Sequence, residues 1–118
     1  MLRDDELIRF LTGNNSLISA TVERFEIFKS DYDLNIDVHV KLLYSKTNPH
    51  LILKFKKVLE YSFFHSSDQD FYYIENCKLF KSDRGFYLSL DPFDETESVH
   101  LQDQDYIIAK SIEGQLSF

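Results

Sequence analysis

Cysteine, tryptophan, glycine and proline are scarce in this chain of 118 residues, which has one Cys, no Trp, three Gly and two Pro. The single cysteine, Cys77, excludes an internal disulfide and any zinc site built from several cysteines. Three glycines are too few for the glycine-rich cradle that nucleotide sites use. No window approaches the roughly 18 consecutive apolar residues that a transmembrane helix needs.

The N-terminal sequence, Met-Leu-Arg-Asp-Asp-Glu, is acidic, whereas a secretory signal is basic and then apolar. A lone cysteine is typical of proteins in a reducing compartment. We therefore expect a soluble, cytoplasmic protein that does not bind membranes.

The composition predicts one domain covering residues 1–118, with 43% hydrophobic residues to build its core. The net charge of −7 argues against a nucleic-acid surface, because phosphate binding needs clustered Lys and Arg. The one dense basic group, Lys54, Lys56 and Lys57, is too small to change this conclusion.

Hydrophobic spacing predicts a short helix over residues 4–12, ended by Gly13, and then strands. The predicted strands cover residues 17–28, 34–44, 51–63, 71–80, 86–91 and 106–118. Within them we expect one bulge near Glu23 and Arg24, where the apolar face switches, and another near Lys57, because the run is too long for a straight strand. Leu59, Tyr61 and Phe63 are expected on the same apolar face as Leu51, Leu53 and Phe55. Gly85, in the tight turn 83–85, is expected to take a positive φ.

Short turns between sequential strands indicate an antiparallel meander, because parallel strands need long crossovers. The predicted fold class is α+β, with one N-terminal helix followed by a curved six-stranded antiparallel meander sheet. One short helix cannot cover six strands, so curvature, partial closure into a barrel or a partner must bury the remaining apolar surface.

The segment from Ser89 to Tyr106 contains six carboxylates and no Lys or Arg, and we call it the acidic segment. Its acids affect association with charged partners more than they affect the fold. Three interpretations stay open: a solvated loop, a partner-binding surface, or a Ca²⁺ or Mg²⁺ site. The spacing of the acids lacks the pattern of an EF-hand loop, so we predict no metal and no cofactor.

Other chemistry-bearing residues form no recognisable motif. The four histidines are scattered, and Cys77 lies in an amphipathic strand without an evident activating base. On the polar face of the sheet, His39 and Lys41 are expected near Lys54 and Lys56, where charge pairing across strands is the favoured interpretation and a mixed-charge docking surface the alternative. We therefore predict no catalytic residues.

The residues Ser89-Leu90-Asp91-Pro92-Phe93-Asp94-Glu95, followed by Asp103-Gln104-Asp105-Tyr106, resemble a segment found in small bacterial proteins. Proteins of this size and acidity are similar to immunity proteins, which neutralise toxins of interbacterial competition systems. The resemblance implies binding of another protein, in some cases a basic toxin domain, rather than catalysis.

We therefore expect a protein-binding module, in which acids mimic the phosphate ligand of a basic partner and aromatic residues anchor it. The predicted contacts are Asp91, Phe93, Asp94, Glu95, Glu97, Asp103, Asp105 and Tyr106. Two alternatives remain: an enzyme or a domain that binds a metal or small ligand through the same carboxylates, and a structural subunit that buries its open sheet face in a homodimer.

Overall fold

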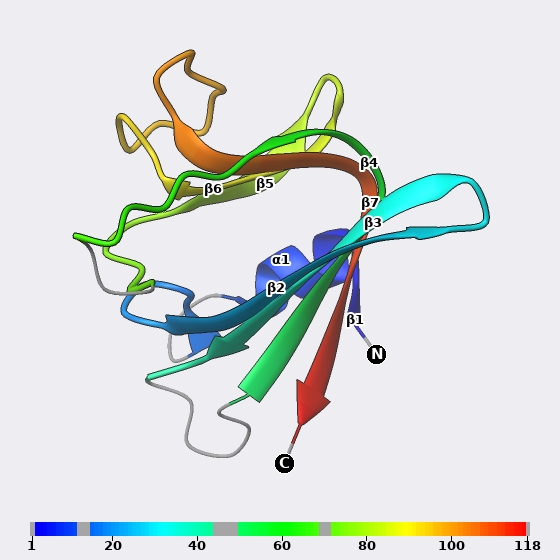
Figure 1. Cartoon of the computed structure of the whole chain (residues 1–118), viewed down its shortest axis with the longest axis horizontal. Coiled ribbons are helices and arrows are strands. Elements are labelled where there is room, and N and C mark those ends of the chain that lie inside the picture. Colours follow the sequence, from blue (N-terminus) through cyan, green and yellow to red (C-terminus); the bar gives the residue numbers. More distant parts are fainter. Residues whose placement is uncertain (1, 12–14, 44–49, 69–71, 118) are drawn as a thin grey trace.

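The computed structural model describes residues 2–11, 15–43, 50–68 and 72–117 (Figure 1). Its elements are β1 (Leu2–Arg3), α1 (Asp5–Phe10), β2 (Thr21–Ser30), β3 (Asp33–Lys41), β4 (His50–Ser62), β5 (Lys78–Ser82), β6 (Gly85–Asp91) and β7 (Gln104–Ser117). The chain is mostly antiparallel sheet with a short N-terminal helix, as predicted in outline. The described residues form seven strands rather than six, because β1 adds a short strand beside β7.

The strand order β2-β3-β4-β7-β6-β5 differs from the predicted meander. β4 pairs with β7 from His50↔Ser117 to Ser62↔Tyr106, so the last strand lies in the middle of the sheet. These are the two longest strands, with 13 and 14 residues, and each can complete a long hydrogen-bonded ladder with the other. In a meander, β4 would instead pair with the next strand of the chain, β5.

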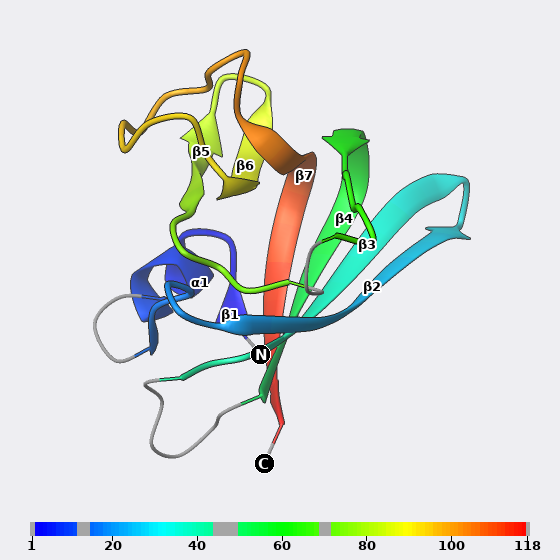
Figure 2. The ribbon, with the colours of Figure 1, turned by 60° about the vertical axis from the view of Figure 1, so that its left-hand side comes forward.

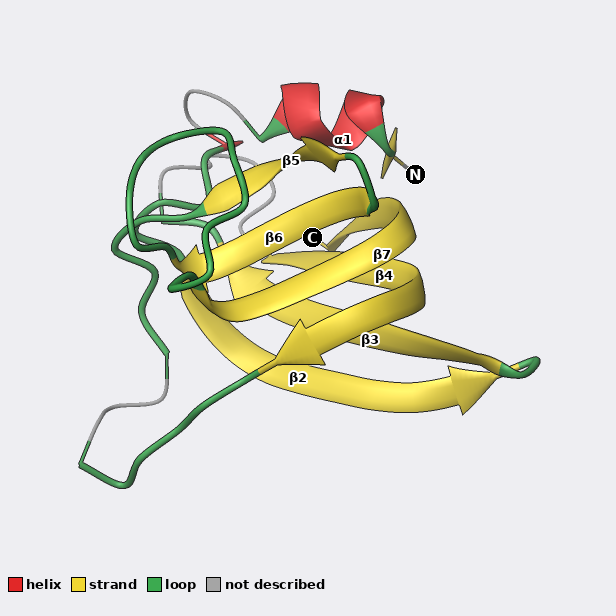
Figure 3. Cartoon of the chain, turned by 90° about the horizontal axis from the view of Figure 1, so that it is seen from above, coloured by secondary structure: helices red, strands yellow, loops and turns green. Residues whose placement is uncertain are grey.

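The predicted strand 71–80 is wrong over most of its length. β5 begins only at Lys78, and Tyr73 forms an isolated bridge with Thr21. The Ile74 N–H donates to the Ala20 carbonyl at 3.0 Å, so the chain before β5 contacts the start of β2. Since β2 and β5 are the two ends of the strand order, these contacts partly close the curved sheet into a barrel, as Figure 3 illustrates. Position 71 lies outside the described residues.

Both predicted bulges are confirmed. The β2–β3 register shifts between Val22 and Arg24, and the β4–β7 register shifts between Val58 and Glu60, close to Lys57, which has a φ of 56°. The second bulge changes which β4 side chains face inward, since Val58 packs against the core whereas Leu59 is 44% exposed. The predicted position of Leu59 and Tyr61 on the buried face is therefore wrong.

Helix α1 is shorter than the predicted 4–12 and lies beside β1 and β7 (Figure 2). Asp4 fixes its start to β7, because its N–H donates to the Ile112 carbonyl and its carboxylate accepts from the Ile112 N–H, at 2.9 and 3.0 Å. The Leu7 side chain is fully buried and lies where a Cβ on Gly114 would otherwise be. The predicted stop at Gly13 lies outside the described residues.

The apolar side chains that face the inside of the curved sheet form one continuous core cluster. Strand β6 is buried on both faces: Phe86, Leu88 and Leu90 belong to this core, while Tyr87 and Ser89 are buried on the other face. A segment of the chain must therefore cover the outer face of β6. Within the described ranges, no helix has the length and apolarity to cross a membrane.

Candidate functional site

The β6–β7 loop, residues 92–103, contains most of the acidic segment and has no helix or strand of its own. Its two ends meet where Asp91 pairs with Gln104, and the loop is drawn yellow to orange in Figure 1. A connection of this length is usually variable and mobile unless side chains fix it. In this loop, the fixing groups come from the loop itself and from β5 and β6.

The Asp103 carboxylate organises the loop. Its side chain is 0% exposed and accepts hydrogen bonds from two backbone N–H groups of the loop, those of Phe93 at 2.8 Å and His100 at 3.0 Å. It also accepts from the Tyr87 hydroxyl at 2.7 Å, on the outer face of β6. One buried carboxylate thus joins the beginning and the end of the loop to the sheet.

Lys78, the first residue of β5, neutralises this carboxylate. Its Nζ lies 3.1 Å from both Asp103 oxygens, 2.7 Å from Asp94 Oδ1 and 2.8 Å from the Ser98 carbonyl oxygen. Its side chain is only 3% exposed, so the ammonium has exchanged water for these oxygen atoms. A buried charge is tolerated only when it is paired and hydrogen-bonded in this way.

The pKa values of Asp103, Lys78 and Asp94 reflect these contacts. Burial raises the pKa of Asp103, but the hydrogen bonds from Phe93, Tyr87, His100 and Lys78 outweigh it and hold that pKa below the ordinary value. Burial likewise lowers the pKa of Lys78, while its bonds to Asp94 and Asp103 outweigh this and raise it. The bond from Lys78, together with those from Thr96, lowers the pKa of Asp94 to about 2. All three groups are therefore charged at neutral pH.

The Asp105 carboxylate fixes the connection between β4 and β5 in a similar way. Its carboxylate accepts hydrogen bonds from the Phe64 N–H at 2.8 Å and from the Tyr72 hydroxyl at 2.6 Å. The residue is 8% exposed. It ties β7 to the chain that runs between β4 and β5.

The structure separates the eight predicted contact residues into three groups. Asp103 and Asp105 are buried and have internal partners, so they do not lie on the surface where the prediction put them. Asp94 and Tyr106 are partly exposed, and each has a partner within the chain: Asp94 pairs with Lys78, and the Tyr106 hydroxyl donates to Glu60, which also pairs with Arg84. The exposed residues of the set are Asp91, Phe93, Glu95 and Glu97.

Two exposed apolar residues of the β6–β7 loop were missed by the sequence analysis. Leu101 is fully exposed and Val99 is 52% exposed, alongside Phe93 at 58%. The Phe93 ring stacks on the His100 ring with centroids 4.2 Å apart, which holds it in place. Val99 and Leu101 could have been found from the tripeptide Val-His-Leu, which stands in a stretch otherwise rich in polar residues.

Residues 95–99 form a ridge between two grooves. The helix-side groove, of about 320 Å³, lies between this ridge, β5 and the chain that includes α1. The hairpin-side groove, of about 440 Å³, lies between the ridge and the β5–β6 hairpin. Glu97 lines both grooves. The loop therefore presents a shaped surface rather than a flat one.

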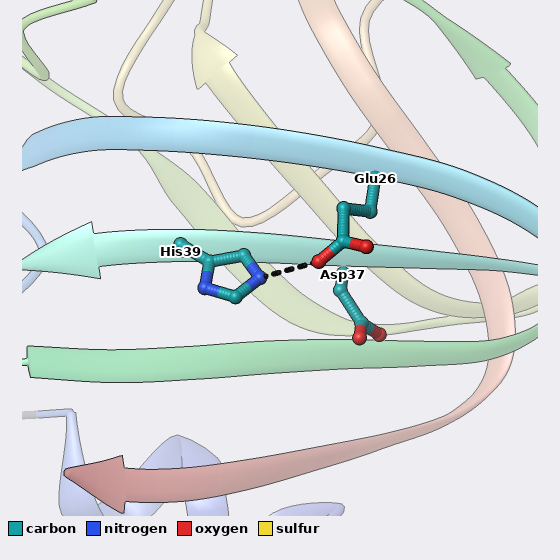
Figure 4. Close-up of side chains that lie close together, drawn as sticks. All are labelled: Glu26, Asp37 and His39. Carbon is teal, nitrogen blue, oxygen red and sulfur yellow. Dashed lines mark hydrogen bonds and ion pairs between the residues drawn. The ribbon is translucent and has the colours of Figure 1, made fainter.

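A second cluster lies on the outer face of β2 and β3. Figure 4 shows Glu26 and His39 hydrogen-bonded to each other with Asp37 beside them, and ligand atoms of the three residues lie within 4.8 Å of one another, a donor set that Zn²⁺ accepts. Both acids already face bases, however. His39 Nε2 lies 2.9 Å and Arg24 Nη2 lies 3.1 Å from the Glu26 carboxylate, and Lys54 lies opposite Asp37 in the β3–β4 register, where its positive charge favours the Asp37 carboxylate. We therefore interpret the cluster as cross-strand ion pairing.

Asp37 in this cluster gives a testable prediction. Burial raises the pKa of Asp37 above its ordinary 3.8 by more than the facing Lys54 lowers it, and Glu26 adds to the increase. Asp37→Asn should therefore raise the free energy of unfolding at pH 7, by about 0.3 kcal/mol after allowance for solvent screening. The gain should shrink toward pH 3, where the carboxyl is protonated in both states. Urea denaturation at both pH values measures it. A variant that is less stable at pH 7 would mean that the Lys54 attraction dominates.

Cys77 is half-buried, and burial raises the pKa of its thiol to about 11. A thiol with this pKa is almost fully protonated at neutral pH and is a poor nucleophile. His50 Nδ1 lies 3.1 Å from Glu23 Oε1, far along the chain from the β6–β7 loop. Cys77 lines the helix-side groove together with Glu95 and Glu97, but its protonated thiol adds no nucleophile to these acids, and the His50 ring contacts Glu23 instead.

Comparison with models of known protein families, with curated proteins and with solved structures found no match for this chain. Its function must therefore be inferred from its own residues and their geometry.

Proposed function

We propose that this chain is a protein-binding module that contacts a basic partner through the β6–β7 loop. The contact surface comprises the exposed members of the predicted set and the two apolar residues that the structure adds. These are Asp91, Phe93, Glu95, Glu97, Val99 and Leu101. Asp103 and Asp105 act indirectly, by holding the backbone that carries this surface.

The observation that carries the proposal is that buried charged groups fix the loop, while other side chains of the loop are exposed. Asp103 and Lys78 are buried and hydrogen-bonded, while three large apolar side chains, Phe93, Val99 and Leu101, are exposed among carboxylates. Holding a loop in one conformation before binding reduces the conformational entropy lost on association. Apolar anchors beside a charged rim are the usual composition of a protein–protein contact.

The charge of the molecule favours a basic partner. The net charge is −7, and the ridge contributes Glu95 and Glu97 without a neighbouring exposed base on the ridge itself. An acidic surface of this kind accelerates encounter with a positively charged protein and disfavours nucleic acid. The resemblance of the Ser-Leu-Asp-Pro-Phe-Asp-Glu segment to immunity proteins supports the same class of partner, a toxin whose active site is built to bind phosphate.

A charge-reversal pair tests this surface. Wild-type chain, Glu95→Lys/Glu97→Lys and the control Asp31→Lys/Asp68→Lys are used to capture proteins from the native cell, with mass spectrometry of each eluate. The control changes two exposed acids outside the loop and alters the net charge equally. We expect a basic protein retained by the wild type and the control and lost by the loop variant.

Kinetics with that captured protein provide the quantitative measurement. The loop variant should associate at least about tenfold more slowly at low salt, and its rate should depend less on ionic strength, because the steering charges have been reversed. Equal losses in the control would assign the effect to net charge alone. Unchanged rates in both variants would place the contact surface elsewhere.

A further inference from the structure

The helix-side groove has an apolar floor. Ile8 and Leu11 line it from the side of α1, Ile18 from the chain before β2, and Leu79 and Phe80 from β5. Its volume of about 320 Å³ is at the small end of the range for pockets that hold a ligand group, roughly 300 Å³ and upward. The groove is therefore large enough for one bulky side chain rather than for a large ligand.

The rim of the same groove is acidic. Glu95, Thr96 and Glu97 line it from the β6–β7 loop. Among the described residues that line the groove, Lys78 is the one base, and its ammonium is directed to Asp94 and Asp103 with 3% of the side chain exposed. A group entering the groove thus meets partly buried apolar side chains and two exposed carboxylates.

The rim is also held in place. Asp94 and Ser98, on either side of the rim residues, both bind the Lys78 ammonium. The Asp94 carboxylate in addition accepts from the Thr96 hydroxyl at 2.9 Å. A partner therefore loses little free energy in ordering this side of the groove.

We propose that the helix-side groove receives a large apolar side chain from a basic segment of the partner polypeptide. This inference rests on the proposed function and specifies the chemistry of the partner. The apolar side chain, a Leu, Met or aromatic residue, is buried against Ile18 and Leu79, and a Lys or Arg next to it pairs with Glu95 or Glu97. A buried anchor surrounded by charged contacts that exclude water is the arrangement from which a contact derives most of its affinity.

The test uses a displayed library of random 12-residue peptides, selected against the wild-type chain. We expect enriched sequences to combine one large apolar residue with Lys or Arg within about two positions of it. The affinity of one enriched, fluorescently labelled peptide is then measured by anisotropy for the wild type and for variants of the groove.

Ile18→Arg and Ile27→Arg form a matched pair, because both isoleucines are 43% exposed and Ile27 lies on β2, outside the groove. We expect Ile18→Arg to weaken peptide binding at least about tenfold, since the guanidinium occupies the groove and pairs with its rim. Ile27→Arg should stay within about twofold of the wild type. Ile18→Ser, which keeps the groove open but removes apolar contact, should lie in between, and thermal melting verifies that each variant folds.

The outcomes separate this inference from the proposed function. If Glu95→Lys/Glu97→Lys abolishes peptide binding while both Ile18 variants bind normally, the groove is not the anchor site and the proposed function stands. If the Ile18 variants and the loop variant all bind as the wild type does, both proposals fail. Enriched peptides without basic residues would overturn the assigned partner chemistry.

Discussion

Asp103→Asn is expected to lower the free energy of unfolding by up to about 3–5 kcal/mol, because it removes the fully buried carboxylate and leaves the buried Lys78 ammonium with the partly exposed Asp94 as its charged partner. Lys78→Met should have a similar effect, since Asp103 would then keep a buried charge without a cation. The side chains involved are 3% and 0% exposed, so water cannot replace the missing partner without opening the loop. Urea denaturation of each variant at pH 7 measures the loss.

Asp94→Asn is the matched control for this pair. Asp94 binds the same ammonium at 2.7 Å, but its side chain is 33% exposed, so its loss should be far smaller. The double variant Lys78→Met/Asp103→Leu should be more stable than the sum of the single effects predicts, because no unpaired buried charge remains. Additive single effects would mean that Lys78 and Asp103 do not act as a pair.

The pH dependence of the wild type follows from the same groups. The folded-state pKa of Asp103 lies below its ordinary value of 3.8, so its carboxylate stabilises the fold fully above that value. This stabilisation is lost as the pH falls below about 4 and through the folded-state pKa. Asp103→Asn should therefore flatten the decrease in stability between pH 4 and pH 2, relative to the wild type. Hydrogen exchange should show the amides of Phe93 and His100 opening first, because they donate to this carboxylate.

Gly85→Ala should produce the second large loss of stability. Gly85 opens β6 with a φ of +138°, as its place in the tight turn predicted, and an alanine in that conformation costs about 1–3 kcal/mol. The added Cβ would also lie 2.5 Å from the Ala109 carbonyl oxygen, which belongs to the backbone of β7 and cannot rotate away. β6 and β7 must therefore separate locally at this end of their ladder.

Gly114→Ala is the control for this substitution. Its Cβ would lie equally close, 2.5 Å, to Leu7 Cδ1, but that atom is the end of a flexible side chain and can move. We expect a clearly smaller decrease in the midpoint of urea denaturation than for Gly85→Ala. An equal or larger decrease would show that the contact between α1 and β7 tolerates less adjustment than the β6–β7 ladder. Gly85 matters to the loop because its hairpin carries both Lys78 and Tyr87, the two sheet residues that hold Asp103.

Features that depend on neighbouring residues were predictable. The bulge near Glu23 follows from a change in the two-residue period, the bulge near Lys57 from the length of the extended run, and the turn at Gly85 from the tolerance of glycine for positive φ. Strand β3 is the clearest case, because its alternation places Ile36, Val38 and Val40 inside without help from any other segment. In each case the physical cause lies within about ten residues of the chain.

The strand order and the roles of the acids were not predictable in this way. Nothing near β4 indicates that β7, some fifty residues later, will pair with it, since many apolar strands fit the same ladder. The early part of segment 71–80 has strand-like composition, yet Tyr73 makes a single bridge, because only the start of β2 lies beside it.

The acidic segment shows both what the sequence can predict and what it cannot. Its composition by itself determined that a charged connection without secondary structure lies before the last strand, and that the molecule is acidic. Only the tertiary structure decided which acids are available to a partner. Lys78, distant in sequence, takes Asp103 and Asp94 as its partners, while Glu95 and Glu97 stay exposed. The physical reason is that the charge of a carboxylate is set by its own chemistry, whereas its burial and its partners are set by residues that folding brings from elsewhere in the chain.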